Sequence, residues 1–255
     1  KIRLDFTEYD SFVRGMQEAG MRGPLVLTLG NSWLGHYEMD LAREFGLTLL
    51  EREIGGRICT LADFTDPRWE KYWVEGLRLI FEHARQAGWP ELALLIHDEP
   101  TKHILPYYIH KYHLVKKYFP QVPVYGVFFE PEKDPGPLVA SCDILVANRD
   151  LARTSALARL HGKRFWSYIN VCADQSFGVS RLLYGQIPAY YGSEAMFFWC
   201  WNYWVGDPWN DFDGWSENAG GPSQSDADWV AVYPSVDGRE PVRTRTGKVR
   251  GEISR

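Results

Sequence analysis

The chain has 255 residues, 45% of them apolar, and a length typical of a single-domain α/β barrel. Its net charge is −5, and it has no Lys/Arg cluster longer than the pair Lys116–Lys117 before the basic tail over residues 243–255, which argues against nucleic acid as a partner. No apolar run approaches the roughly 18 residues that a membrane span needs.

The first predicted element is a helix over residues 5–19. Apolar side chains recur on one face of it: Phe6, Tyr9, Phe12, Val13 and Met16. Asp5 and Glu8 have the spacing of a capping box, and Gly20 is a typical stop signal.

A longer helix is predicted over residues 66–88, with Asp66 as its cap and Pro67 in its first turn. Large apolar residues follow at helical spacing: Trp69, Tyr72, Trp73, Leu77, Ile80, Phe81 and Ala84. This stripe is interpreted as core packing rather than as a binding surface.

Six segments have the pattern of strands, with helical segments between most of them: 23–31, 92–97, 122–129, 143–148, 164–170 and 195–202. The alternation predicts an α/β fold with a parallel sheet, of the (β/α)₈ TIM-barrel type. Since the chain opens on a helix and shows six strands, we expect the first two βα units to be missing from this sequence. Residues 1–255 are then a single catalytic barrel domain, truncated at both ends. An open six-stranded sheet is the alternative.

The spacing of the cysteines and of the candidate metal ligands matches no known site. The four Cys residues show no C-x-x-C spacing and are interpreted as buried thiols. His97, Asp98 and His103 match no helix-borne zinc pattern, and the acidic loop over residues 205–228 lacks calcium-loop spacing. We therefore predict no metal and no cofactor. No signal peptide or initiator Met is visible, so compartment and oligomeric state are left without a prediction.

The segment "LALLIHDEP" at residues 92–100 carries two adjacent acids, Asp98 and Glu99, directly after an apolar strand. In an α/β barrel, catalytic groups stand where strands end and βα loops begin. Adjacent strand residues face opposite sides, so both acids can serve one site only if regular pleating lapses there, and Pro100 favours such a lapse. Taken alone, a D-E-P tripeptide is more often a solvated turn.

The chain is rich in aromatic residues, with 11 Trp, 14 Tyr and 13 Phe, and many lie near predicted strand ends. Flat aromatic faces suit sugar rings, so polar and aromatic residues at strand ends are candidates for sugar contacts. Alternation in residues 164–170 places Tyr168 and Asn170 on one face with Trp166, although structural hydrogen bonds explain them equally well. Further along the chain, Trp201 is predicted as a stacking wall, Asn202 as a hydroxyl partner and Trp204 as a second stacking residue. The remaining predicted substrate-binding residues are Asn31, His97 and Tyr125.

The string "LALLIHDEP", together with "SRLLYGQIPAYYGSEAMFFWCWNYWVGDPW" at 180–209 and "VAVYP" at 230–234, resembles the catalytic barrel of glycoside hydrolase family 123. Members of that family are β-N-acetylgalactosaminidases. The resemblance implies retaining hydrolysis in which the 2-acetamido carbonyl of the sugar attacks the anomeric carbon, one of the exceptions to the two-carboxylate scheme.

By the same resemblance, Asp98 orients the acetamido group and Glu99 is the general acid/base. The negative charge of Asp98 then favours a proton on its neighbour. The implied partner is a glycan or glycoconjugate with a terminal N-acetylhexosamine, and N-acetylgalactosamine is the expected preference.

Two alternatives remain. One is a retaining glycosidase of another specificity, with Glu130 or Glu194 as a carboxylate nucleophile. The other is a non-catalytic carbohydrate-binding protein that keeps the aromatic residues, although a lectin has little reason to keep the acid pair.

Overall fold

The computed structural model describes residues 1–29, 36–54, 57–100, 104–128, 136–147, 150–168, 181–197, 202–203 and 229–230. The chain divides into two compact units. The first comprises Lys1–Val146 and Ala156–Arg164, and the second comprises Ala147–Ser155 and Phe165–Arg255. Each unit is described by itself.

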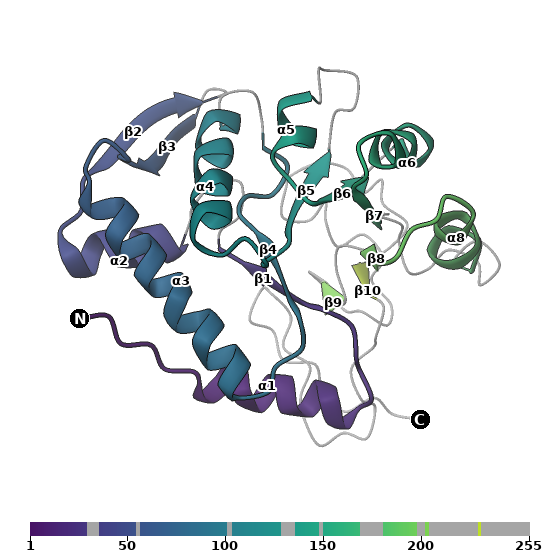
Figure 1. Cartoon of the computed structure of the whole chain (residues 1–255), viewed down its shortest axis with the longest axis horizontal. Coiled ribbons are helices and arrows are strands. Elements are labelled where there is room, and N and C mark those ends of the chain that lie inside the picture. The colour runs from purple at the N-terminus through teal and green to yellow at the C-terminus, as the bar shows by residue number, and fades with distance from the viewer. Residues whose placement is uncertain are drawn as a thin grey trace, which may run out of the picture. The chain divides into compact units, whose positions relative to one another are not determined.

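The first unit holds most of the regular structure (Figure 1). Its helices are α1 (Thr7–Glu18), α2 (His36–Phe45), α3 (Arg68–Gln86), α4 (Leu105–Tyr118) and α5 (Gly136–Ala140). Its strands are β1 (Leu25–Thr28), β2 (Leu49–Ile54), β3 (Arg57–Ala62), β4 (Leu92–Leu95), β5 (Val124–Phe128) and β6 (Ile144–Ala147, whose last residue belongs to the second unit). Helix α6 (Leu151–Leu160) is divided between the two units.

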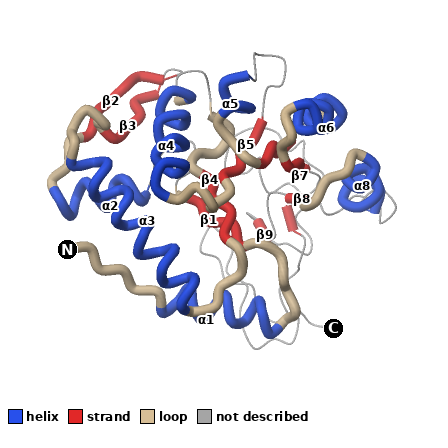
Figure 2. Tube along the Cα trace, in the orientation of Figure 1, coloured by secondary structure: helices blue, strands red, loops and turns tan. Residues whose placement is uncertain are grey.

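Four strands of the first unit hydrogen-bond in the order β1-β4-β5-β6. Strand β1 runs parallel to β4 with Leu25 opposite Leu92, and β4 runs parallel to β5 with Leu95 opposite Tyr125. All four residues of β4 are buried, as are those of β6, because helices cover parallel sheets and leave neither face in water. Figure 2 shows helices α1, α3 and α4 outside strands β1 and β4.

Helix α3 forms where the sequence predicts it, and its aromatic stripe is core. Asp66 accepts a hydrogen bond from the backbone N–H of Arg68 at 3.0 Å, which satisfies one of the free amides of the first turn. Trp69, Trp73 and Leu77 are fully buried. The Trp69 indole N–H donates to the carbonyl of Thr48 at 2.7 Å, so its polar group is satisfied inside the core.

Gly76 explains how α2 can approach α3 closely. A Cβ at this position would overlap the hydroxyl of Tyr37, which donates a hydrogen bond to the carbonyl of Trp73 at 2.8 Å. The absence of a side chain at residue 76 therefore allows the Tyr37 ring to pack directly on the α3 backbone.

Helix α1 is shorter than predicted and is capped differently. It begins at Thr7, and Asp5 accepts hydrogen bonds from the Thr7 backbone N–H at 2.9 Å and hydroxyl at 2.7 Å, so the capping box with Glu8 is wrong. Gly20 has φ +83°, as its stop role requires. Of the predicted apolar face only Val13 is buried, while Tyr9 and Phe12 are exposed among the described residues.

A polar contact fixes α1 against the end of α3. The carboxylate of Asp10 accepts a hydrogen bond from the Trp89 indole N–H at 2.8 Å and lies 2.8 Å from Nε2 of His83. Phe6 stacks on the His83 ring, with centroids 3.9 Å apart. These contacts lower the pKa of Asp10, with the His83 hydrogen bond the largest cause.

The antiparallel hairpin β2–β3 was not predicted. It pairs Leu49 with Ala62 and Ile54 with Arg57, and it forms its own two-stranded sheet beside α2. The sequence signal for this hairpin is the Gly55–Gly56 pair, which separates two segments of mixed apolar and polar residues. Two-residue hairpin turns favour glycine.

The second unit contains β7 (Arg164–Tyr168), whose first residue belongs to the first unit, and β8 (Met196–Phe197), which run parallel with Ser167 opposite Met196. A π-helical turn, η1 (Leu182–Gln186), continues into α8 (Ile187–Tyr190), and β9 (Asn202–Tyr203) pairs antiparallel with β10 (Trp229–Val230). Ser167 is fully buried and shares a 3.2 Å hydrogen bond with Ser193.

The α/β fold is confirmed, and each of the six predicted strands contains an observed one. A closed eight-stranded barrel, the missing βα units and a single domain stay predictions. Among the described residues, no helix has the length and apolarity to cross a membrane. Cys142 is the one predicted thiol whose side chain is described. Burial raises its pKa to about 12.

A buried ion pair joins α2 to α4. Lys111 Nζ lies 2.8 Å from Glu38 Oε1, which also accepts the Trp73 indole N–H at 3.1 Å. Glu38 and Lys111 are both buried, and Glu38 Oε2 has no hydrogen-bond partner among the described residues. Among the described residues, Lys111 is therefore the cation that compensates the buried charge of this carboxylate.

We expect Lys111→Met to lower the free energy of unfolding by about 3–5 kcal/mol, because Glu38 is then left as an uncompensated buried charge. The double variant Glu38→Gln, Lys111→Met keeps an acceptor for Trp73. Its free energy of unfolding should lie within about 1 kcal/mol of that of the native protein. Urea unfolding measures both. The control is Arg43→Met, which breaks the exposed Arg43–Asp40 pair on the same helix α2 and should change little. A double variant as unstable as the single one would contradict the charge argument.

Candidate active site

The acid pair lies in a turn at the carboxyl end of β4. Strand β4 ends at Leu95, Ile96 and His97 stay buried, and Asp98 and Glu99 are half-buried where the chain leaves the core. An apolar run followed directly by polar residues thus forms a buried strand, and the two acidic residues lie just after its carboxyl end. This is the end of a parallel strand at which α/β enzymes place their catalytic groups.

The backbone of this turn departs from regular pleating, as predicted. Glu99 has φ +43° and is the one non-glycine residue with positive φ in the described part of the chain. Left-handed backbone at a residue with a Cβ costs on the order of 1–3 kcal/mol, and such strain persists only where surrounding contacts hold it. Asp98 and Glu99 therefore do not alternate across the strand in the way two regular strand residues would.

One hydrogen bond holds the peptide unit between the acids. Nδ1 of His97 lies 2.8 Å from the carbonyl oxygen of Asp98. Burial raises the pKa of Asp98 above its ordinary value, and the nearby backbone N–H of Glu99 offsets part of that rise.

Tyr125 lies in β5 beside the last residue of β4. Its register partner is Leu95, and its carbonyl accepts a hydrogen bond from the hydroxyl of Tyr108 at 3.3 Å. The Tyr125 side chain is buried, so packing in the sheet accounts for much of its environment. Its predicted contact with substrate stays a prediction.

His97 was predicted to bind substrate, and the structure shows it in contact with the backbone of the acid pair. Its ring is buried and its Nδ1 edge contacts the backbone of the acid pair. The sequence signal for this contact is its place directly before Asp98, from which an imidazole can reach the next carbonyl.

The second unit places two further predicted residues. Tyr168 is the last residue of β7 and is half-buried, and Asn202 lies in β9 opposite Val230. Glu194 precedes β8, and its backbone N–H donates to the carbonyl of Phe165 at 3.0 Å. It therefore stands at the amino end of the β7–β8 pair, the end opposite to the usual place of a catalytic nucleophile.

Several predicted residues lie outside the described residues: Asn31, Asn170, Trp201 and Trp204, and the alternative nucleophile Glu130. Their roles stay predictions.

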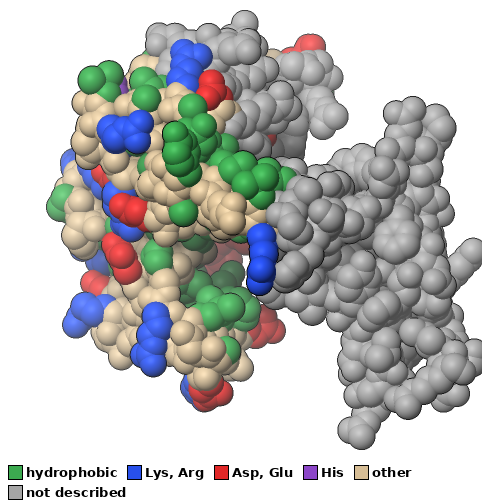
Figure 3. Space-filling model, turned by 90° about the vertical axis from the view of Figure 1, so that its right-hand side faces the viewer, with side chains coloured by type: hydrophobic (Ala, Val, Ile, Leu, Met, Phe, Trp, Pro, Cys, Tyr) green, Lys and Arg blue, Asp and Glu red, His purple; other side chains and the backbone are tan. Residues whose placement is uncertain are grey.

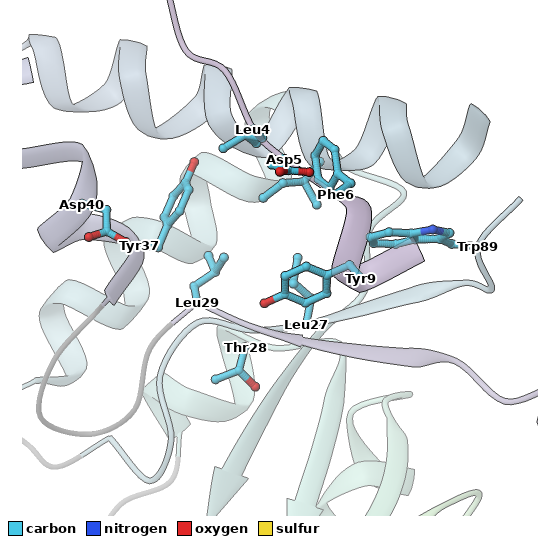
Figure 4. Close-up of a pocket in the computed structure, with 11 residues that line it drawn as sticks. Leu4, Asp5, Phe6, Tyr9, Leu27, Thr28, Leu29, Tyr37, Asp40 and Trp89 are labelled. Atoms are coloured by element: carbon cyan, nitrogen blue, oxygen red, sulfur yellow. The ribbon is translucent and has the colours of Figure 1, made fainter. Parts of the chain in front are cut away.

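A separate cavity of about 400 Å³ opens in the first unit beside β1 (Figure 4). Figure 4 shows Phe6, Tyr9 and Trp89 gathered at one end and Tyr37 and Asp40 at the other. The remaining lining residues are Leu4, Asp5, Leu27, Thr28, Leu29 and Ile80.

Three polar side chains of this cavity already have partners. The Tyr37 hydroxyl donates to the Trp73 carbonyl, Asp5 accepts from Thr7, and Asp40 pairs with Arg43. The other lining residues are mainly apolar, apart from the hydroxyls of Tyr9 and Thr28, and none of the residues predicted for catalysis lines the cavity. It therefore lacks the convergent polar groups that an active site needs.

Charged side chains are mixed over the described surface seen in Figure 3, where basic and acidic groups lie among each other. This distribution agrees with the net charge of −5 and gives no extended basic area on that part of the surface.

An α/β fold with parallel strands and a strained acid pair at the carboxyl end of one of them has the arrangement of α/β enzymes. The sequence matches the family described as glycoside hydrolase 123, catalytic domain, over residues 1–249. The chain belongs to this family, so the resemblance seen in the sequence is confirmed. Family membership supports glycosidase activity.

Two solved structures are similar to the chain at low identity. A glycoside hydrolase family 2 member from Bacteroides cellulosilyticus DSM 14838 is 18% identical with a TM-score of 0.40, and the match covers 74% of this chain and 25% of that protein. A glycoside hydrolase family 5 mannosidase from Rhizomucor miehei, in complex with mannosyl-fructose, is 14% identical with a TM-score of 0.46. This match covers 89% of this chain and 71% of that protein. The chain thus spans a quarter of the length of the family 2 protein. No curated protein matches the sequence.

Proposed function

We propose that the chain is a retaining, exo-acting β-N-acetylgalactosaminidase or hexosaminidase that uses the 2-acetamido group of its substrate as the nucleophile. The observation that carries this proposal is the Asp98–Glu99 turn at the carboxyl end of β4, in a chain that belongs to glycoside hydrolase family 123. The proposed substrate is a glycan with a terminal N-acetylhexosamine.

In the first step, the carboxylate of Asp98 accepts a hydrogen bond from the acetamido N–H and so aligns the acetamido carbonyl with the anomeric carbon. The carbonyl oxygen forms a bond to that carbon as the glycosidic bond breaks, and Glu99 donates its proton to the departing oxygen. Positive charge develops on the new oxazoline ring. Because Asp98 is partly withdrawn from water, its charge acts on that ring with less screening than a solvated carboxylate would have.

In the second step, Glu99, now ionised, takes a proton from water as the water oxygen attacks the anomeric carbon. The oxazoline opens and returns its electrons to the acetamido carbonyl, so the product keeps the configuration of the substrate. One residue thus serves as acid and then as base, and no enzyme nucleophile is needed.

The sugar contacts complete the proposal. Tyr168 is proposed to donate to the acetamido oxygen, Asn170 and Asn202 to bind ring hydroxyls, and Trp201 and Trp204 to stack on the sugar face. Asn31 and Tyr125 are proposed as rim and wall residues. Aromatic faces suit the apolar faces of sugar rings, which is the physical basis for the stacking roles.

We expect the enzyme to cleave an aryl 2-acetamido-2-deoxy-β-galactoside at least ~10³-fold faster, in kcat/KM, than the matching 2-hydroxy galactoside. The reason is that only the first substrate carries its own positioned nucleophile. Release of the phenol measures both rates.

A thiazoline that mimics the oxazoline should compete with the substrate, and an unreactive glycoside of the same sugar serves as the control for simple sugar binding. Equal turnover of the two substrates, with no inhibition by the thiazoline, would contradict the proposal in favour of a carboxylate nucleophile. Saccharide binding without hydrolysis of any glycoside would instead identify a carbohydrate-binding protein.

A further inference from the structure

The peptide unit that joins Asp98 to Glu99 is held at its carbonyl group. Its carbonyl oxygen lies 2.8 Å from Nδ1 of His97. A carbonyl oxygen only accepts hydrogen bonds, so Nδ1 of His97 carries the hydrogen in this contact. The side chain of His97 therefore restrains the orientation of the peptide plane.

This orientation is the one that strains Glu99. Rotation of the peptide plane between residues 98 and 99 would change φ of Glu99 and let it leave the left-handed region for the negative values that a residue with a Cβ prefers. The same rotation would swing the Glu99 side chain to another direction relative to Asp98. The contacts that oppose it therefore decide how the two carboxyl groups lie relative to each other.

The donor itself is rigidly placed. His97 follows Ile96 directly after β4, and both residues are buried, so packing in the core restricts the imidazole ring. A donor held in this way can oppose a strained backbone, whereas a solvated side chain would exchange its contact for water.

We propose that His97 is a positioning residue whose Nδ1–H holds the Asp98–Glu99 peptide in its strained orientation and so sets the relative direction of the two carboxyl groups. This inference rests on the proposed function for its catalytic consequence. The predicted substrate contact of His97 stays a separate prediction.

Three variants separate the hydrogen bond from the bulk of the ring. His97→Asn places an amide N–H near the position of Nδ1, His97→Gln extends its amide toward the position of Nε2, and His97→Leu removes the donor. We expect kcat to fall about 10- to 100-fold in the Leu and Gln variants, because misplacement of a catalytic group by ~1 Å has effects of this order. The Asn variant should recover most of kcat, and KM should change by less than about threefold in all of them.

A structural measurement gives a second, activity-independent readout. Crystal structures of the variants should show a negative φ at Glu99 in the Leu and Gln variants and a positive φ in the Asn variant. His161→Asn is the matched control, since His161 is exposed just after α6, and it should leave kcat and the φ of Glu99 unchanged.

Unchanged kcat and a positive φ at Glu99 in the Leu and Gln variants would overturn the inference. If the Leu variant does not fold, the Gln variant, which keeps a polar side chain of similar length, decides the same question. A wild-type protein that cleaves no 2-acetamido glycoside would count against the proposed function alone, because the φ comparison still tests whether His97 holds the peptide.

Discussion

Replacing Glu99 with Gln will lower kcat by about 10²–10⁴-fold for a substrate with a poor leaving group, which is the usual range for loss of general acid catalysis. An alkyl glycoside depends on protonation of the departing oxygen, and a Gln amide has no proton of suitable acidity. An aryl glycoside with an acidic phenol leaves without that help, so its first step should be affected much less. The substitution preserves the shape of the side chain, which limits the effect to the loss of the proton.

The measurement is a series of aryl 2-acetamido glycosides whose phenols differ in pKa. The rate of phenol release should depend steeply on the phenol pKa in Glu99→Gln and weakly in the wild type. Glu91→Gln is the matched control, because Glu91 is an exposed acid at the opposite end of β4 and should leave the series unchanged. Equal slopes in Glu99→Gln and the wild type would remove Glu99 from the role of acid.

Much of the first unit was predictable because its strands and helices have simple local signals. Strand β4 is a short apolar run that ends in charged residues and a proline, and α3 combines an Asp cap with buried residues at helical spacing. The same signal at the end of β4 placed Asp98 and Glu99 at the strand exit. Patterns of this kind depend on neighbours along the chain, so sequence alone captures them.

The missed features depend on contacts that the spacing of apolar residues does not encode. The capping box at α1 failed because Asp5 bonds instead to Thr7, an equally local alternative for the same side chain. Burial of Tyr9 and Phe12 was not realised, since periodicity identifies a face without showing what covers it. The left-handed backbone of Glu99 and the His97 hydrogen bond arise from tertiary placement, and no residue preference would lead to Glu at positive φ.

Replacing Asp98 with Asn will lower kcat by about 10²–10³-fold with good and poor leaving groups alike, since loss of one positioned charge at the transition state has effects of this size. The proposed role of Asp98 is to align the acetamido group and to balance the charge of the oxazoline ring, and neither task depends on the leaving group. The rate of phenol release should therefore depend on the phenol pKa in the Asn variant as it does in the wild type. Asp40→Asn, at an exposed carboxylate on α2, is the control and should not change kcat. A loss confined to poor leaving groups would assign proton transfer to Asp98 instead.

The same substitution should make the fold more stable, by about 1–4 °C in Tm if the gain is of the order of 1 kcal/mol or less. Burial raises the pKa of Asp98, so the folded protein binds this proton more tightly than the unfolded chain does. Stability from this group is then complete below the ordinary carboxyl pKa and is lost as the pH rises through the raised, folded-state pKa. Asn cannot ionise and avoids that loss. Unfolding by urea from about pH 3 to pH 7 should show Asp98→Asn gaining on the wild type as the pH rises. If the difference in free energy of unfolding between the two proteins is constant with pH, or if it shrinks, ionisation of Asp98 does not destabilise the fold. A widening difference together with the loss of kcat would show that the ionised carboxylate is kept for its chemistry at the expense of stability.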